Sequence, residues 1–144
     1  MLITKNIEYQ FFRLKGKLFK EKEQKGLHRF FRRQGVKLEK NCRIYSNIVT
    51  SEPYLLSIGD NVTISSEVLF LTHDNSVCKC EKNATDIFGK IKIGSNCFIG
   101  ARSTLLYGVT LADSIIVAAG SVVTRSFVEE GIIIDGVPAK KMVM

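Results

Sequence analysis

An aliphatic residue recurs at every sixth position in one stretch of this chain, without a slip over six repeats. A period of six is even, so in an extended chain every repeated residue points to the same side, whereas an α-helix has a period of 3.6. Gly, Asp, Asn and Ser fill the places between, where short strands would turn. Such hexapeptide repetition predicts a parallel β-helix of stacked coils. The repeated residues are Ile93, Ile99, Leu105, Leu111, Val117 and Val123.

The same register extends toward the N-terminus. It begins near Val36, is interrupted by a turn cluster at 50–53, resumes at Ile58 and fails over the polar stretch 72–90. Long excursions from compact scaffolds are commonly functional. We therefore predict a mainly β protein with a helical N-terminal segment (1–35), a triangular β-helix of three hexads per coil (36–128) with an excursion loop (74–90), and a C-terminal tail (129–144).

The N-terminal segment has helical periodicity. We expect one helix from Ile7 to about Lys25, ended by Gly26, and a short second helix from Leu27 to Arg33. His28 is expected on the surface without a partner. Aromatic side chains of this segment should cover the open first coil, whose strand edges would otherwise be exposed; they are Tyr9, Phe11, Phe12, Phe19, Phe30 and Phe31. The alternative is weak membrane-surface contact through residues 7–33.

The net charge of +7 is concentrated at one end, because residues 1–45 hold thirteen Lys and Arg against four Glu. Such asymmetry can indicate nucleic acid or an anionic membrane. The helical pattern favours a solvated helix face instead, and we expect no nucleic-acid partner. Residues 1–10 lack the apolar core and cleavage site of a signal peptide, so we expect a cytoplasmic protein. Cys42 and Cys97 occupy inward positions and should be buried thiols.

One histidine is a candidate for chemistry. His73 falls where a regular strand passes into the excursion loop, and imidazole exchanges protons near neutrality, so it could act as a general base. The alternative is a structural or merely exposed histidine. A Gly-x-Ser-x-Gly elbow, a P-loop and a dinucleotide Gly motif are absent. Two histidines in all do not supply a three-His zinc site.

Several segments together resemble the hexapeptide-repeat acyltransferases, left-handed β-helix trimers that include maltose, galactoside, serine and xenobiotic acetyltransferases. The resemblance covers about 36–141, and the Pro53-Tyr54-Leu55 and Thr72-His73-Asp74 runs look most like short sugar O-acetyltransferases of capsule and lipopolysaccharide modification. The remaining matching segments are 58–65, 93–100, 118–125 and 136–140.

The resemblance implies a left-handed homotrimer that moves an acetyl group from acetyl-CoA directly to a saccharide hydroxyl, without a metal. It implies that His73 is the base, that the N–H of Ala101 stabilises the oxyanion, and that Asn47 and Asp74 help to hold the acceptor. It also implies CoA contacts between subunits, through Ala119, Thr124, Arg125 and Lys140.

Other functions stay open on the sequence alone. The same chemistry could act on serine, an antibiotic or an amino-sugar nitrogen. A β-helix that serves as a non-catalytic structural or binding subunit is the alternative from another class, and the presence of His73 disfavours it. A carbonic-anhydrase relative would need three metal-binding histidines.

Overall fold

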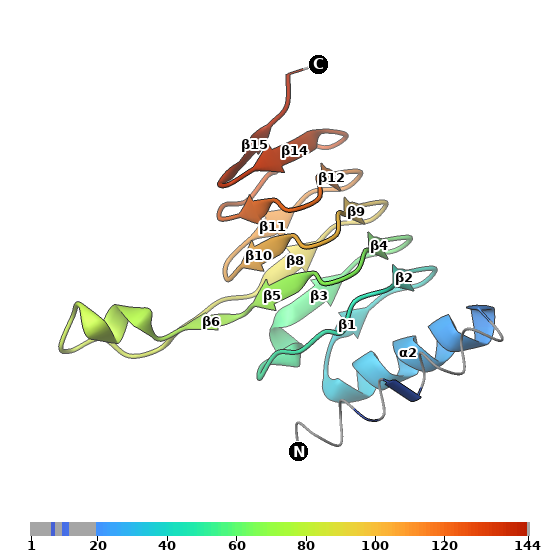
Figure 1. Ribbon diagram of the computed structural model, residues 1–144, viewed down its shortest axis with the longest axis horizontal. Coiled ribbons are helices and arrows are strands. Elements are labelled where there is room, and N and C mark those ends of the chain that lie inside the picture. Colours follow the sequence, from blue (N-terminus) through green and yellow to red (C-terminus); the bar gives the residue numbers. More distant parts are fainter. Residues whose placement is uncertain (1–6, 8–9, 12–19, 144) are drawn as a thin grey trace.

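The computed structural model describes residues 7, 10, 11 and 20–143. Figure 1 shows flat coils stacked along one axis, with helix α2 (Lys20–Gln34) at one end, the C-terminus at the other, and an arm projecting from one side. The first helix predicted from Ile7 lies mostly outside the described residues. Within the described part of the chain, no helix is long and apolar enough to cross a membrane.

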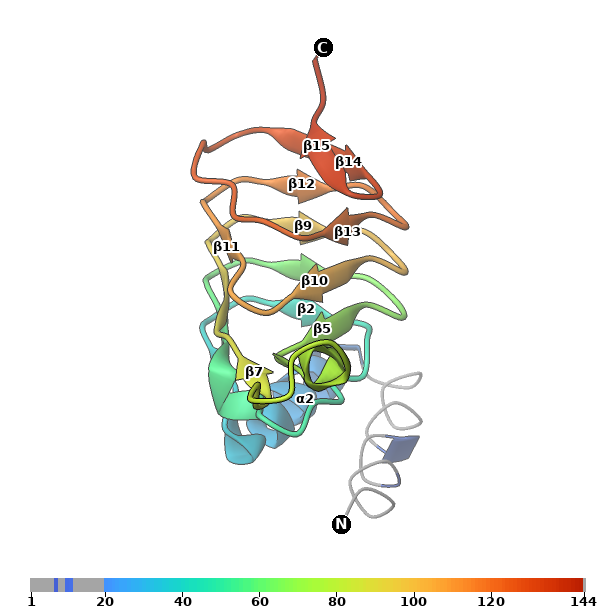
Figure 2. The ribbon, with the colours of Figure 1, turned by 90° about the vertical axis from the view of Figure 1, so that its left-hand side faces the viewer.

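Three sheets form the sides of the stack (Figure 2), and almost every pairing in them is parallel. The first sheet contains β1 (Lys37–Leu38), β3 (Leu56–Ile58), β8 (Ile91–Ile93) and β11 (Thr110–Leu111). The second contains β2 (Arg43–Ile44), β4 (Thr63–Ile64), β9 (Phe98–Ile99), β12 (Ile116–Val117), β14 (Ile133–Gly136) and the antiparallel β15 (Ala139–Lys141). The third contains β5 (Leu69–Leu71), β10 (Thr104–Leu106) and β13 (Val122–Val123).

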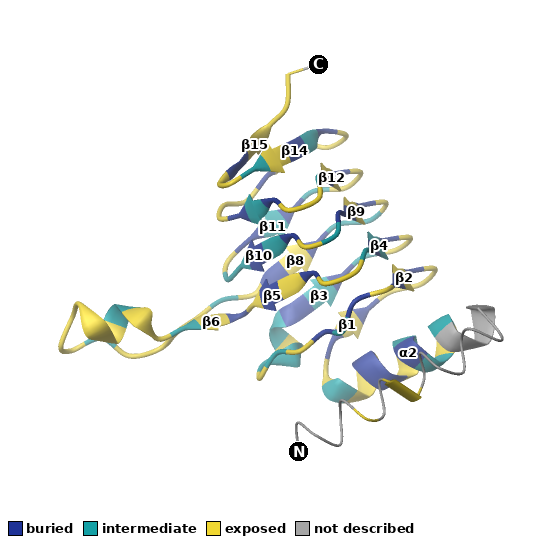
Figure 3. Cartoon of the chain, viewed as in Figure 1, coloured by how far each residue is buried: buried dark blue, intermediate teal, exposed yellow. Residues whose placement is uncertain are grey.

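The six-residue repeat sets the register of these sheets. Leu111 pairs with Ile93, and Val117 pairs with Ile99, so three hexads make one coil as predicted. Figure 3 shows buried residues alternating with exposed ones along every coil. The inward residues form one core; in the two predicted coils they are Ile93, Ile99, Leu105, Leu111, Val117 and Val123, each at most 4% exposed. Both thiols expected inside, Cys42 and Cys97, are buried.

Helix α2 covers the open first coil. Leu27, Phe30 and Phe31 are buried against the β-helix, so the two aromatics are not available to a membrane. The helix runs through Gly26, contrary to our expectation of a break there. A glycine inside a helix costs about 1 kcal/mol, which is less than the burial of one large apolar side chain returns. It ends at Gly35, whose φ of +107° suits glycine.

His28 is a second correction, because it has a partner. It is half-buried, and its Nε2 donates to the carbonyl oxygen of Cys42 at 2.8 Å. Burial lowers the pKa of His28, against the opposing effect of that hydrogen bond. One turn further along, Arg32 donates to the carbonyl oxygens of Leu38 (2.7 Å) and Glu39 (3.0 Å). Helix side chains thus satisfy acceptors that the first coil leaves open.

The C-terminal segment, expected to leave the β-helix as a tail, instead continues the stack. Phe127 bridges to Leu111 and is 7% exposed, and β14 pairs in parallel with β12. Ile134 is fully buried. Burial of these side chains covers the last regular coil, and β15 folds back on β14 to close this end.

The excursion is an ordered arm. It starts with β6 (His73–Asp74), passes through a short 3-10 helix (Ser76–Lys79), and returns through β7 (Ile87–Phe88), which pairs antiparallel with β6. Its base is tightly packed, because a Cβ at Gly89 would lie 2.6 Å from the backbone N of Gly108. The arm therefore leaves the stack from a fixed point.

Candidate active site

His73 lies at the base of the arm, at the corner that follows β5. The N–H of Gly89 donates to the carbonyl oxygen of Thr72 at 2.9 Å, and this bond closes the arm just beside His73. The His73 ring packs 5.8 Å from the ring of Phe88, centroid to centroid. Its side chain is 40% exposed, so a substrate can reach the imidazole.

A carboxylate holds this histidine. Nδ1 of His73 lies 2.8 Å from Oε2 of Glu52, and the hydroxyl of Thr72 donates to the same oxygen at 2.8 Å. The hydroxyls of Thr50 and Thr72 lie 2.5 Å apart, and the N–H of Glu52 donates to Thr50 at 3.2 Å. Because the proton of Thr72 is directed to Glu52, Thr50 donates to Thr72. The N–H of Glu52, the hydroxyls of Thr50 and Thr72, and the carboxylate of Glu52 thus form a closed ring of hydrogen bonds. His73 bonds to the carboxylate of this ring.

These hydrogen bonds determine the ionisation of Glu52 and the tautomer of His73. Glu52 is 12% exposed, and burial acts to raise its pKa, but the hydrogen bonds from His73 and Thr72 outweigh burial and lower the pKa. An ionised Glu52 only accepts, so the proton of a neutral His73 sits on Nδ1. The lone pair is then on Nε2, to which no residue in the described part of the chain bonds. That nitrogen can take a proton from a substrate.

Asp74 follows His73 but is turned toward the arm and the corner behind it. Its Oδ1 accepts from the N–H of Ser76 at 2.7 Å, and its Oδ2 lies 3.5 Å from the hydroxyl of Tyr107. The backbone hydrogen bond from Ser76 lowers the pKa of Asp74. These bonds give Asp74 a part in positioning the base of the arm.

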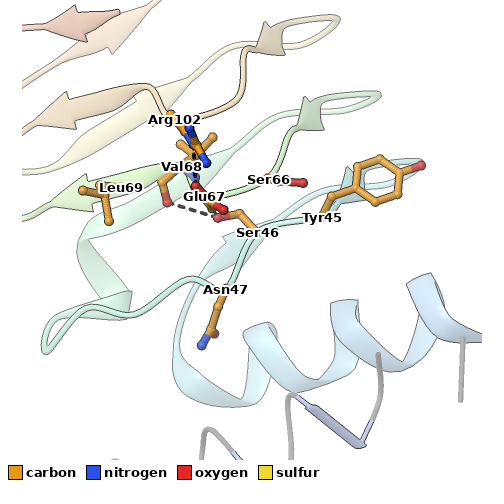
Figure 4. A pocket seen from close by; sticks show the side chains of 8 residues that line it. All are labelled: Tyr45, Ser46, Asn47, Ser66, Glu67, Val68, Leu69 and Arg102. Carbon is orange, nitrogen blue, oxygen red and sulfur yellow. Dashed lines mark hydrogen bonds and ion pairs between the residues drawn. The ribbon is translucent and has the colours of Figure 1, made fainter. Parts of the chain in front are cut away.

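Ala101, Ala119 and Asn47 lie at a different corner, the one that follows strands of the second sheet. The N–H of Ala101 bonds to none of the described residues, whereas its carbonyl oxygen accepts from Gly120 at 2.8 Å. Beside it is a shallow hollow of about 600 Å³ (Figure 4). Its lining residues are Tyr45, Ser46, Asn47, Ser66, Glu67, Val68, Leu69 and Arg102.

The strands of the third sheet separate these two corners. The chain passes from Glu67 through β5 before it reaches His73, and the coils above repeat this path. One chain therefore does not bring His73 together with Asn47 or Ala101.

The predicted CoA contacts are also spread out. Thr124 and Arg125 are exposed at the corner after β13, which is the corner of His73 but two coils away. The Arg125 guanidinium lies 5.3 Å from the centroid of the Phe127 ring. Lys140 is exposed on β15, opposite Asp135.

Sequence reasoning missed Glu52 and Thr50 as site residues. Both belong to the turn cluster that interrupts the repeat, and that interruption was the available signal. Among the described residues, no group of three or more His, Cys, Asp or Glu side chains could hold a metal ion.

Comparisons with known proteins agree with this architecture. A family model described as "Hexapeptide repeat of succinyl-transferase" matches residues 90–125. Protein CapG of Staphylococcus aureus is 43% identical over 116 residues, 77% of this chain and 67% of CapG. Galactoside O-acetyltransferase of Escherichia coli K12 is 29% identical over 106 residues, and the match spans 73% of this chain but only 52% of that enzyme.

A solved structure is similar over nearly the whole chain. It is a hexapeptide-repeat acetyltransferase of Vibrio cholerae O1 biovar eltor complexed with acetyl coenzyme A, with a TM-score of 0.62 and 21% identity. The match covers 97% of this chain and 86% of that one. At this identity the likeness concerns the fold.

Proposed function

Because the chain belongs to the hexapeptide-repeat acyltransferase family, we propose that it transfers an acetyl group from acetyl-CoA to a hydroxyl of a saccharide. The observation that carries this proposal is the 2.8 Å contact between His73 Nδ1 and Glu52. It leaves Nε2 of a neutral imidazole at an exposed position, as a general base requires.

The chemistry needs one base and one oxyanion donor. Nε2 of His73 takes the proton of the acceptor hydroxyl while that oxygen attacks the thioester carbonyl carbon. Glu52 stabilises the imidazolium that forms, and the N–H of Ala101 stabilises the oxyanion. When the C–S bond breaks, the imidazolium returns its proton to the thiolate, so the products are an acetyl ester and free CoA. No covalent enzyme intermediate is required.

The donor is proposed from the family and from the charges of this chain. A protein of similar fold was solved with acetyl coenzyme A. CoA carries phosphates, which need cations, and Arg125 and Lys140 are exposed basic side chains near the end of the stack. Ala119 and Thr124 would contact the uncharged pantetheine part.

The site would be completed between copies of the chain, and we propose a trimer of left-handed, triangular β-helices. In such an assembly the corner of Asn47 and Ala101 on one copy would face His73 of the next. The outward face of the third sheet supports packing between copies, because it carries Leu69, Leu71 and Leu106. The outward face of the first sheet is polar, with Lys37, Ser57, Lys92 and Thr110.

A saccharide is the acceptor that the relatives favour, since one of them is named for a galactoside. Serine, an antibiotic or an amino-sugar nitrogen would use the same base. A cytoplasmic location, the domain boundaries that precede the C-terminal segment, and weak membrane contact through residues 7–33 stay predictions.

The proposal is tested by titrating the purified full chain with acetyl-CoA and with CoA in a calorimeter, with its mass measured in solution. We expect saturable binding to a trimer, followed by thiol release when methyl β-galactopyranoside is added. If the well-folded protein binds neither ligand, the proposed acetyl transfer is refuted and a role as a non-catalytic structural subunit is favoured.

A further inference from the structure

Two residues of the hollow have an unusual backbone. Glu67 and Arg102 have φ values of +59° and +60° at the same corner of successive coils. This left-handed region is unfavourable for residues other than Gly, Asn and Asp. At the corner after the first sheet, the same conformation is adopted by asparagine in three coils, at Asn41, Asn61 and Asn96, and by Ser114 in the fourth.

Stability does not account for this choice. Nε of Arg102 lies 2.6 Å from Oε2 of Glu67, but the two side chains are 77% and 64% exposed. An exposed ion pair contributes little to folding, and less than the two strained residues cost. Strain that stability does not explain is typical of functional positions.

The ion pair stands at the edge of a hollow that the fold itself creates. The first coil has no strand under β5, and instead Ser46 Oγ bonds to the N–H (3.0 Å) and the carbonyl oxygen (3.1 Å) of Val68. Figure 4 shows Arg102 and Glu67 on one side of this hollow and Tyr45 on another. The Tyr45 side chain is 51% exposed, so its ring is accessible to a ligand.

We propose that Glu67 and Arg102 are specificity-determining residues that bind adjacent hydroxyls of an uncharged sugar in this hollow. The inference deepens the proposed function, on which its biological meaning rests. A vicinal diol both donates and accepts hydrogen bonds. The carboxylate of Glu67 supplies acceptors, and the Nη groups of Arg102 supply donors. The Tyr45 ring offers an apolar surface to the sugar face.

The charge of the pair selects against acidic sugars. The Arg102 guanidinium is already paired with the Glu67 carboxylate at 2.6 Å, and no other Arg among the described residues lines the hollow. A ligand carboxylate that approached Arg102 would therefore also meet the carboxylate of Glu67. Like charges in contact disfavour binding. A neutral hexoside is therefore the class of ligand, rather than a uronic acid or a sugar phosphate.

The test measures binding without any acetyl donor. Methyl β-galactopyranoside is titrated into the ¹⁵N-labelled full chain, and backbone amide shifts are followed by NMR. We expect saturable shifts at Tyr45, Glu67 and Arg102, and weaker binding of galacturonic acid. Glu67→Asn and Arg102→Asn should each weaken binding of the galactoside about tenfold or more. Lys92→Gln, on the outward face of the first sheet, is the matched control.

The same variants separate recognition from folding. Asn tolerates the left-handed region, so both substitutions should keep or raise Tm while binding falls. Unshifted amides, unchanged affinity in both variants, or tighter binding of galacturonic acid would each overturn the proposal. Shifts without any acetyl transfer would retain the sugar site and refute the proposed reaction. Acetyl transfer with an unaltered KM for the acceptor in both variants would retain the proposed reaction and refute the sugar site.

Discussion

Gln24 and Ile44 exchange two hydrogen bonds. The Gln24 Nε2 donates to the carbonyl oxygen of Ile44 at 3.2 Å, and the N–H of Ile44 donates to the Gln24 Oε1 at 2.9 Å. Side-chain amide and backbone amide have the same donor and acceptor, so Gln24 takes the place of a neighbouring strand below β2. With His28 and Arg32 it forms one helix stripe at a spacing of four residues, and this stripe closes the end of the β-helix.

Gln24→Ala should destabilise the chain. It leaves the N–H and the carbonyl oxygen of Ile44 without their partner, and an unsatisfied buried backbone group costs roughly 1–3 kcal/mol. Urea unfolding should show this loss in the free energy of unfolding, and hydrogen exchange at the Ile44 amide should accelerate. Lys25→Ala, one position along on the exposed side of the helix, is the control. Equal stability of the two variants would contradict the role of Gln24.

The β-helix could be predicted from the sequence because each coil repeats one local pattern. Leu105 is buried for the same reason as Ile99, namely an even period with turns between, and the contacts lie eighteen residues apart. Prediction failed where that period ends. Ile134 falls outside the six-residue step that runs to Val123, so the sequence suggested a tail where the structure adds further pairing.

The candidate site was predictable only in part. His73 was found from its place at the end of a strand. Its contact with Glu52 joins residues 21 apart through the stacking of an irregular loop on the next coil, and no local pattern encodes that distance. The break expected at Gly26 was wrong for a related reason. Tertiary burial of Leu27 on the first coil overrides a local propensity.

His73→Ala should lower kcat by roughly 10²–10⁴, the usual contribution of a general base. Mass in solution should stay as in the parent chain, and Tm should fall only slightly, because Glu52 loses the hydrogen bond of His73 but keeps that of Thr72. Steady-state thiol release with acetyl-CoA measures the rate. An unchanged kcat would rule out this histidine as the base.

Glu52→Gln should lower kcat by a smaller factor and leave KM for acetyl-CoA unchanged. The carboxamide can donate to Nδ1, which favours the tautomer with its proton on Nε2 and removes the basic lone pair from the substrate side. The pH profile of kcat should change shape with it. Glu67→Gln, which replaces a carboxylate at another corner, is the comparison. It should alter KM for the acceptor and leave the pH profile of kcat unchanged.

Stability should depend on pH through Glu52. Its folded-state pKa lies below the usual value of 4.5, so the carboxylate stabilises the fold fully above that value, and the effect is lost as the pH falls through the lowered pKa. The difference in unfolding free energy between the parent chain and Glu52→Gln should be constant above about pH 5 and shrink below it. Urea unfolding at several pH values measures this difference. A gap that widens in acid would mean that the pKa is raised.

Gly89→Ala should impair activity although Gly89 does not touch the reacting groups. A Cβ at this position would lie 2.6 Å from the backbone N of Gly108 and 3.0 Å from Tyr107, so the base of the arm must move. The N–H of Gly89 bonds to Thr72, whose hydroxyl bonds to Glu52, and a displacement therefore reaches His73. A misplacement of about 1 Å can cost roughly a hundredfold in rate, and we expect a fall in kcat/KM approaching that size with a small change in Tm. Asn83→Ala, exposed toward the tip of the arm, should leave kcat/KM as it is. Equal activity of both variants would show that the arm does not position the base.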